Sequence, residues 1–348
     1  MAGLAAQARS IGRIVRVCDA RALRLRLVDA VRRVVPFDAY AWLLTDPETT
    51  VGSAPLAAVP CLPQLPSLIR LKYLTEVNRW TRLAGPVALL HEATGGDLSR
   101  SLVWSELLHR YDVVDIASAV FTDQFGCWGF LDLWRTGASG RFTPSEASFL
   151  AGIAAPVTAA LRRSQATTFA VPSPPWPRRG PVLLILSCRL DVLAQTPETQ
   201  DYLRVLVPPD QGRSPIPANA YNVAAQLLAV EAGIDLHPPS ARVHLSGGRW
   251  LTLRAARIED DRPATERDIA VSIEDSSSSE RASIFSFAYG LSPREAELLG
   301  HLVTGADTKD LARLMFLSPY TVQDHLKSIF AKTGVRSRRT LLASALGT

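Results

Sequence analysis

The stretch LSPYTVQDHLKSIFAKTGVRSRR, residues 317–339, carries the signals that begin and end a short helix. Ser318 is a residue type whose side chain caps the first turn, and Pro319 suits the first helical position because the N–H it lacks has no partner there anyway. Gly334 is the residue type that most often follows a helix, since it adopts the left-handed conformation without strain. The sequence therefore predicts a helix over 319–333.

The predicted helix is amphipathic, with about a third of its circumference apolar. A solvated helix in a small bundle would explain this pattern as well as a helix that enters the major groove of DNA, which is about 12 Å wide. Periodicity alone leaves both interpretations open. The apolar stripe consists of Val322, Leu326, Ile329 and Phe330, and the opposite face consists of Tyr320, Asp324, Lys327, Ser328 and Ala331.

The surrounding residues extend the pattern to four helices. Ser292, Pro293 and Glu295 form a capping box, which predicts a helix that ends at Gly305. TKDLARLM (308–315) and SRRTLLASAL (337–346) predict the second and fourth helices. Residues 288–346 resemble the LuxR/NarL-type helix-turn-helix family. The resemblance rests on Arg294, Glu295, Ala312, Ser318, Thr321, Val322, His325, Ile329, Lys332, Gly334, Val335 and Arg338.

In that family the third helix enters the major groove and the fourth commonly supports dimerisation, and the resemblance implies the same here. By position it implies base contacts from Gln323, Asp324 and Lys327, whose side chains suit adenine, cytosine and guanine edges respectively. It implies a structural or phosphate-contacting role for His325. The remaining DNA contacts that we expect, to phosphates or for positioning, are Thr308, Lys309, Ser318, Thr321, Lys332, Arg336 and Arg338.

The composition of the whole chain is that of a globular protein. Its 348 residues are enough for two or three domains. The net charge is +5, and residues 290–348 hold eight basic and five acidic side chains, so +3 of it lies there and fits an anionic partner. The four cysteines and six histidines show no disulfide or zinc spacing. Without an apolar run of about 18 residues or a signal-peptide core, we expect a cytoplasmic protein with no membrane partner.

Two stretches divide the chain. VPSPPWPRRGP (171–181) has five prolines, which predicts a stiff linker, and EDSSSSERAS (274–283) is polar and serine-rich, which predicts a flexible one. No internal repeat is visible. We therefore expect a first domain over 1–170, a Pro-rich linker over 171–181, a second domain over 182–275, a Ser-rich linker over 276–287 and the DNA-binding domain over 288–348.

The two upstream segments both predict α+β folds. The first has a helix, strands, an irregular middle, a hairpin and a closing helix, and resembles a GAF-type sensory domain over about 20–165. The second has a strand, a helix and a three-stranded meander with a turn at Gly247–Gly248, and resembles a PAS-type domain over about 180–275. The expected fold class is thus α+β, GAF-like then PAS-like, followed by an all-α four-helix domain. A phosphoacceptor receiver is not expected, because Lys72 is the one lysine before residue 300.

Five of the seven tryptophans lie in the first segment. Most such side chains pack in a core, but as a group they would also form an apolar pocket wall. Trp42, Trp80 and Trp104 flank irregular or polar sequence and are the candidates for contact with a small apolar or aromatic ligand. We expect no cofactor, because His91, His109 and Cys127 lack the setting of haem or iron ligands, and no enzyme, because no GxSxG or comparable motif occurs.

The sequence thus predicts a transcriptional regulator that binds double-stranded DNA as a homodimer and is controlled by a small molecule through its upstream domains. The alternative keeps the DNA-binding output but places control in protein–protein interaction with no small ligand. RNA polymerase is a further candidate partner. A defined cavity in the first domain would favour the ligand over the protein partner.

Overall fold

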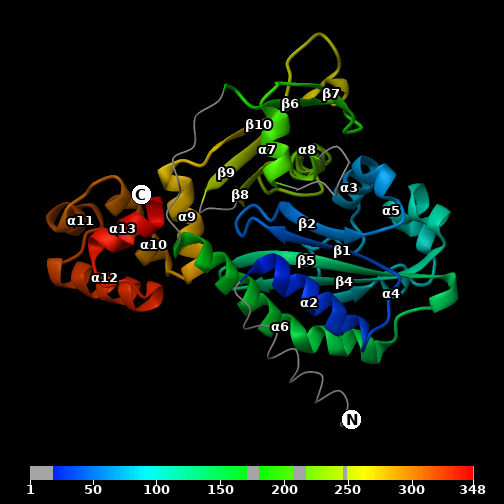
Figure 1. Cartoon of the computed structure of the whole chain (residues 1–348), viewed down its shortest axis with the longest axis horizontal. Coiled ribbons are helices and arrows are strands. Elements are labelled where there is room, and N and C mark those ends of the chain that lie inside the picture. The colour runs from blue at the N-terminus through cyan, green and yellow to red at the C-terminus, as the bar shows by residue number, and fades with distance from the viewer. Residues whose placement is uncertain (1–18, 171–179, 207–216, 246–248, 348) are drawn as a thin grey trace.

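Two antiparallel sheets and a helical C-terminal part make up the computed structural model, which describes residues 19–170, 180–206, 217–245 and 249–347 (Figure 1). The first sheet has the strand order β2-β1-β5-β4-β3. Its long central hairpin is the one that the sequence predicts. The strands are β1 (Ala39–Thr45), β2 (Gly52–Ala58), β3 (Val87–Leu89), β4 (Val113–Asp123) and β5 (Gly126–Thr136).

Helices cover both faces of the first sheet. On one face lie α2 (Ala20–Arg32) and α6 (Pro144–Thr167), and α6 begins at a capping box formed by Thr143 and Glu146. On the other face lies α3 (Leu65–Leu74), with the short α4 (Leu90–Ala93) and α5 (Leu102–Glu106) beside it. Short 3₁₀ turns are η1 (Leu62–Gln64), η2 (Leu98–Arg100), η3 (Leu108–Tyr111), η4 (Gly137–Ser139), η5 (Thr168–Ala170) and, in the second half, η6 (Ala264–Glu266).

The second sheet has the strand order β7-β6-β10-β9-β8. Strands β8 and β9 pair antiparallel as predicted, although the predicted turn at Gly247–Gly248 lies outside the described residues, as do residues 171–179 of the Pro-rich linker. When the strands of each sheet are numbered from 1 to 5 along the chain, both sheets have the order 2-1-5-4-3. Both halves therefore share one topology. The elements are β6 (Leu183–Leu186), β7 (Val192–Gln195), α7 (Thr199–Leu206), α8 (Ala218–Glu231), β8 (Ser240–His244), β9 (Trp250–Arg257) and β10 (Ile269–Asp275).

The two halves pack closely against each other through α3 and α8 (Figure 1). Two buried ion pairs cross this contact in opposite senses. Arg79 of the first half lies 2.5 Å from Asp235, and Arg242 of the second half lies 2.7 Å from Asp46. The side chains of Arg79 and Asp46 are completely inaccessible to solvent. Because a buried charge without its partner is costly, the two pairs fix how the halves are matched at this contact.

Helix α9 (Ser278–Tyr289) lies where the sequence predicts the linker before the DNA-binding domain. The Ser-rich linker expected over 276–287 is instead the start of this helix: Ser277 caps it, and Glu280 completes a capping box. The linker prediction is wrong because the apolar residues that follow the serines supply a buried face. Ile284 and Phe285 of that face have at most 1% of their surface exposed.

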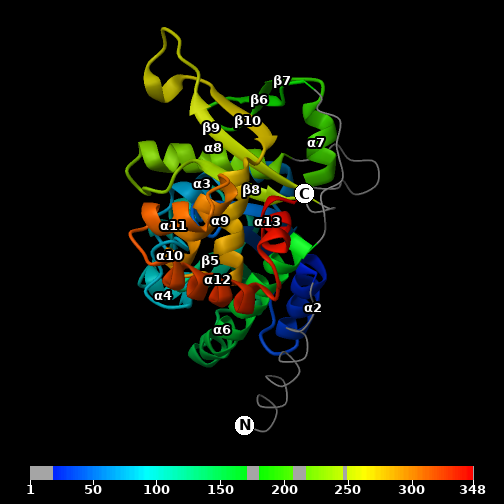
Figure 2. The same ribbon diagram turned by 90° about the vertical axis from the view of Figure 1, so that its left-hand side faces the viewer.

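The C-terminal part is a bundle of four helices, as predicted. They are grouped at one end of the molecule, and Figure 2 looks directly at that end. Helix α9 packs against α6 on one side and against α10 and α13 on the other, so the apolar core continues from the first sheet into the bundle. None of the helices in the described ranges has the length and apolar character needed to cross a membrane. The four helices are α10 (Pro293–Val303), α11 (Thr308–Leu314), α12 (Pro319–Thr333) and α13 (Arg338–Leu346).

Removing the cation from the Arg79–Asp235 pair tests the contact between the halves. Arg79→Met leaves the Asp235 carboxylate buried without its main partner and is expected to lower the free energy of unfolding by about 3–5 kcal/mol, measured by guanidinium denaturation. Arg262→Met, in an exposed ion pair with Asp260, is the matched control and should leave the midpoint nearly unchanged. Equal midpoints for the two variants would contradict the role given to Arg79.

Candidate nucleic-acid interface

Helix α12 is held in the bundle by its apolar side. Ser318 caps its first turn by accepting a hydrogen bond from the Thr321 backbone N–H at 3.1 Å, and Gly334 ends it in the left-handed conformation. Val322, Leu326 and Ile329 are buried where α12 meets α10 and α11. The predicted apolar stripe is therefore confirmed, with Phe330 at its half-buried edge.

The opposite side of α12 is exposed along its length. Gln323, Asp324 and Lys327 all lie there, and Tyr320 has 74% of its surface exposed. The Lys327 ammonium is 3.1 Å from an Asp324 carboxylate oxygen and 5.9 Å from the centre of the Tyr320 ring. The free protein therefore holds Lys327 in a small polar cluster on the face that the sequence assigns to DNA.

Tyr320 is absent from the DNA contacts expected from the sequence, although its place on the same face as Lys327 could have indicated it. Phe316, in the turn before α12, is 94% exposed and has a positive φ of 55°. Four further predicted contacts lie at helix starts. The Ser318 and Thr321 hydroxyls are 2.9 Å apart at the start of α12, and Thr308 and Lys309 begin α11, which Asp307 caps.

A buried carboxylate joins α12 to α10. Glu295 accepts hydrogen bonds from the Lys332 ammonium and from the Ser328 hydroxyl, each at 2.6 Å, and from the Ser292 backbone N–H, also at 2.6 Å. The placement of Ser328 on the exposed face is thus wrong, since its hydroxyl turns toward α10. The phosphate contact of Lys332 stays a prediction, but its ammonium is occupied by Glu295 here.

The same contacts set the charge state of Glu295. Burial alone would raise the pKa of this carboxyl, but the hydrogen bonds from Lys332, Ser328 and Ser292 and the positive charge of Lys332 outweigh it and lower the pKa to about 2. The carboxyl is therefore ionised at neutral pH.

The two arginines expected to contact DNA differ in setting. Arg336 is exposed in the segment between α12 and α13. Arg338 is half-buried and donates a hydrogen bond to the backbone carbonyl of Ala306, in the segment between α10 and α11. Arg338 therefore holds two segments of the bundle together, and Arg336 is the more accessible of the pair.

The three tryptophans proposed as ligand contacts do not share a site. Trp42 is buried against Phe121 beneath α2 and α6, whereas Trp80 is stacked on Phe130 at the contact between the halves. Trp104 is half-buried and donates a hydrogen bond to the Val113 carbonyl, in a third apolar cluster. In the ranges that the structure covers, no group of three or more His, Cys, Asp or Glu side chains is placed to hold a metal ion.

Comparison with known families identifies the helical bundle. Residues 290–345 match the family described as "Bacterial regulatory proteins, luxR family". These residues form a luxR-family helix-turn-helix domain. The match includes α10, α11 and α12 completely and α13 up to its penultimate residue. The exposed side of α12 described above is therefore part of the luxR-family domain.

Curated relatives match this chain over a short segment. Mb0914c of Mycobacterium bovis and Rv0890c of Mycobacterium tuberculosis, both named as candidate HTH-type transcriptional regulators, are each 40% identical to it over 55 residues. The shared segment is 16% of this chain and 6% of each relative. The matched segment is thus a small part of this chain and a smaller part of each relative.

A solved structure, that of Escherichia coli SdiA, aligns with 99% of this chain and 97% of its own, with 12% identity and a TM-score of 0.36. The sensor region of a sensor histidine kinase aligns with 68% of this chain at a TM-score of 0.18. Likenesses at these TM-scores carry no argument about the fold or a ligand of this protein.

The low pKa of Glu295 predicts a pH-dependent stability. Because the pKa is lower in the folded than in the unfolded chain, the stabilisation is complete above about pH 4.5 and is lost as the pH falls toward 2. Glu295→Gln should remove this dependence and lower the free energy of unfolding by about 1.5–3 kcal/mol at pH 7, measured by denaturation followed by circular dichroism. Glu297→Gln, in an exposed pair on the same helix, is the control; identical pH profiles for both variants would refute the assignment.

Proposed function

We propose that this chain is a sequence-specific DNA-binding transcriptional regulator, and that α12 enters the major groove. The observation that carries the proposal is the division of α12 into a buried apolar side and an exposed side with Gln323, Asp324 and Lys327, inside a luxR-family domain. Lysine suits guanine acceptors, glutamine suits adenine, and aspartate accepts from the cytosine amino group. The related HTH-type regulators support this for the domain; the role of the whole chain is our proposal.

The contacts divide into two groups. Side chains on the exposed side of α12 face base edges and give specificity, whereas those at helix starts contact phosphates and fix the register. Lys332 and Arg338 act mainly within the domain, because Glu295 and the Ala306 carbonyl already bind them. The proposed phosphate and positioning contacts that remain are Thr308, Lys309, Ser318, Thr321 and Arg336.

The proposal includes a homodimer on a roughly palindromic site. Two α12 helices contact successive major grooves when the half-sites are about one helical turn, or 34–36 Å, apart. Exposed positions of α13 such as Arg339 and Thr340 are available for contact with a second copy. RNA polymerase is the protein partner that such a regulator would act on.

We propose that the two upstream halves are sensory domains, GAF-like and then PAS-like. A five-stranded antiparallel sheet with helices against it, present in each half, supports that role. Control by a small molecule is the first proposal. The alternative is control by a partner protein with the same DNA-binding output, and the close contact of both halves with each other is compatible with either. We propose no catalytic activity.

Truncating Lys327 tests the groove assignment. The operator is first selected by the full chain from random duplexes. Lys327→Ala should then lose about 1–3 kcal/mol on the selected site, with the loss confined to one base position when single-base variants of the site are compared by fluorescence anisotropy. Arg110→Ala, an exposed cation far from the luxR-family domain, is the control. Unchanged affinity of Lys327→Ala would show that α12 does not contact the bases.

Removing the Asp324 side chain should increase the affinity for random DNA, whereas removing that of Lys327 lowers the affinity for the selected site. Its carboxylate repels phosphates and holds Lys327 at 3.1 Å, so Asp324→Ala should strengthen binding to random duplex DNA while reducing preference for the selected site. Both affinities are measured at one fixed salt concentration. Unchanged binding to random DNA would mean that Asp324 lies away from the duplex, and weaker binding would contradict the repulsion assigned to it.

A further inference from the structure

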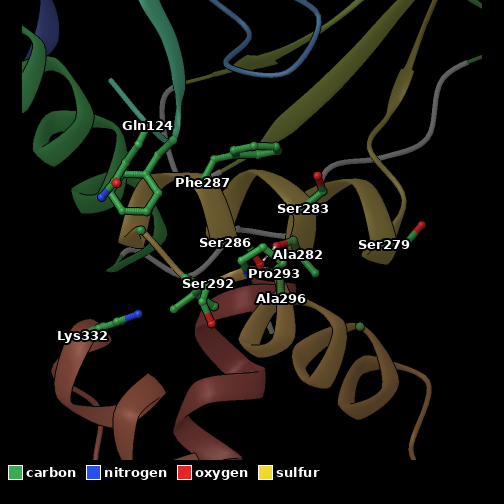
Figure 3. A pocket seen from close by; sticks show the side chains of 14 residues that line it. Gln124, Ser279, Ala282, Ser283, Ser286, Phe287, Ser292, Pro293, Ala296 and Lys332 are labelled. Carbon is green, nitrogen blue, oxygen red and sulfur yellow. Dashed lines mark hydrogen bonds between the residues drawn. The ribbon is translucent and has the colours of Figure 1, made fainter. Parts of the chain in front are cut away.

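A cavity of about 740 Å³ lies at the junction between the sensory halves and the luxR-family domain (Figure 3). Its walls come from the turn between β4 and β5, from α9 and from α10, and the Lys332 side chain of α12 extends toward it. Ligand pockets commonly have volumes of about 300–1,000 Å³. The cavity is separate from the exposed side of α12 and from the three candidate tryptophans.

The cavity exists because side chains are small where α9 faces α10. Ala282 and Ser286 lie on α9, and Ala296 and Gly300 lie on α10. A Cβ atom added at Gly300 would meet no other atom within 4 Å. Glycine inside a helix is unfavourable relative to alanine, so helix stability does not account for it at this position. The space is thus kept open from both sides.

The remaining walls are mostly apolar and already in place. Phe125 and Phe287 approach the cavity from the β4–β5 turn and from α9. The Phe125 ring is covered by the Arg162 guanidinium at 4.8 Å, and it packs so closely on Gly290 that a Cβ there would lie 3.0 Å from the ring. An aromatic wall fixed in this way loses little freedom when a flat apolar molecule binds.

The charges around the cavity are paired. The Lys332 ammonium is 2.6 Å from Glu295, and Arg162 is 3.0 Å from Asp123. A charged ligand would therefore find no uncompensated opposite charge. An ammonium has three N–H donors, and the bond to Glu295 uses one of them. Lys332 can therefore still donate a hydrogen bond to a neutral oxygen. The exposed amide of Gln124 is a second polar group on the rim.

We propose that this junction cavity binds an uncharged, mainly apolar small molecule that places a carbonyl or hydroxyl oxygen beside Lys332. Because its walls belong both to the sensory part and to the luxR-family domain, the ligand stabilises the position in which the two are packed together. The binding site stands on its own geometry; its effect on DNA binding rests on the proposed function.

The test uses Nile red, an uncharged apolar dye with a carbonyl oxygen, titrated into the full chain and followed by fluorescence. Gly300→Phe fills the cavity. Gly152→Phe is the matched control, because Gly152 lies inside α6, a Cβ there also meets nothing within 4 Å, and it does not line the cavity. We expect saturable 1:1 binding by the wild type and the control, and at least tenfold weaker binding by Gly300→Phe.

Equal binding by Gly300→Phe and Gly152→Phe, or no saturable binding by the wild type, would overturn the site. Gly300→Leu repeats the test with a smaller side chain if Gly300→Phe lowers the unfolding midpoint.

The effect on DNA binding is measured separately. The affinity of the wild type for its selected DNA should change at least threefold when the dye is added, and the affinity of Gly300→Phe should not change. An unchanged wild-type affinity would refute the regulatory part alone, and absence of DNA binding in all variants would refute the proposed function while leaving the site.

Discussion

The buried face of α9 is the contact on which the arrangement of this molecule depends. Phe285 is completely buried and meets the Phe169 ring edge-on at 5.3 Å, and the Arg281 guanidinium lies 5.1 Å above the same ring. Phe169 in turn stacks on Trp250 of the second sheet. One aromatic cluster thus joins the end of α6, the second sheet and α9, and α9 carries the luxR-family domain on its other side. The domain is packed onto the two sheet-containing halves and not merely tethered to them.

This packing links the contact between the two sheet-containing halves to the luxR-family domain. Arg242 bonds to Asp46 across the halves and also donates to the Ser283 hydroxyl of α9 at 3.0 Å. A change in the relative position of the two sheets would therefore act on α9 directly. The exposed side of α12 is not covered by the sheet-containing halves, since Gln323 and Lys327 are accessible. A signal received by the upstream halves would then change the position of the luxR-family domain and would not need to uncover α12.

The sequence predicted what short-range signals determine. Caps, prolines and the apolar stripe predicted the four C-terminal helices, and the order of segments in the first domain included the hairpin that β4 and β5 form. It could not predict the bonds of Ser328 and Lys332 to Glu295, because they join residues 33 and 37 positions apart and depend on how α12 crosses α10. The serines before α9 led to the wrong prediction of a flexible linker, because a capping sequence and a flexible linker can have the same composition. The shared strand order of the two sheets leaves no sequence signal, because the two cores use different side chains.

Hydrogen exchange of backbone amides, measured on the full chain with and without its selected DNA duplex, tests the central claim most directly. If the luxR-family domain is packed on the sensory part and α12 contacts DNA, amides of 278–289 exchange slowly in the free chain, and DNA increases protection in 319–333. Rapid exchange of 278–289 in the free chain would contradict the packed arrangement. Protection by DNA that spares 319–333 and falls on another surface would contradict the assignment of α12.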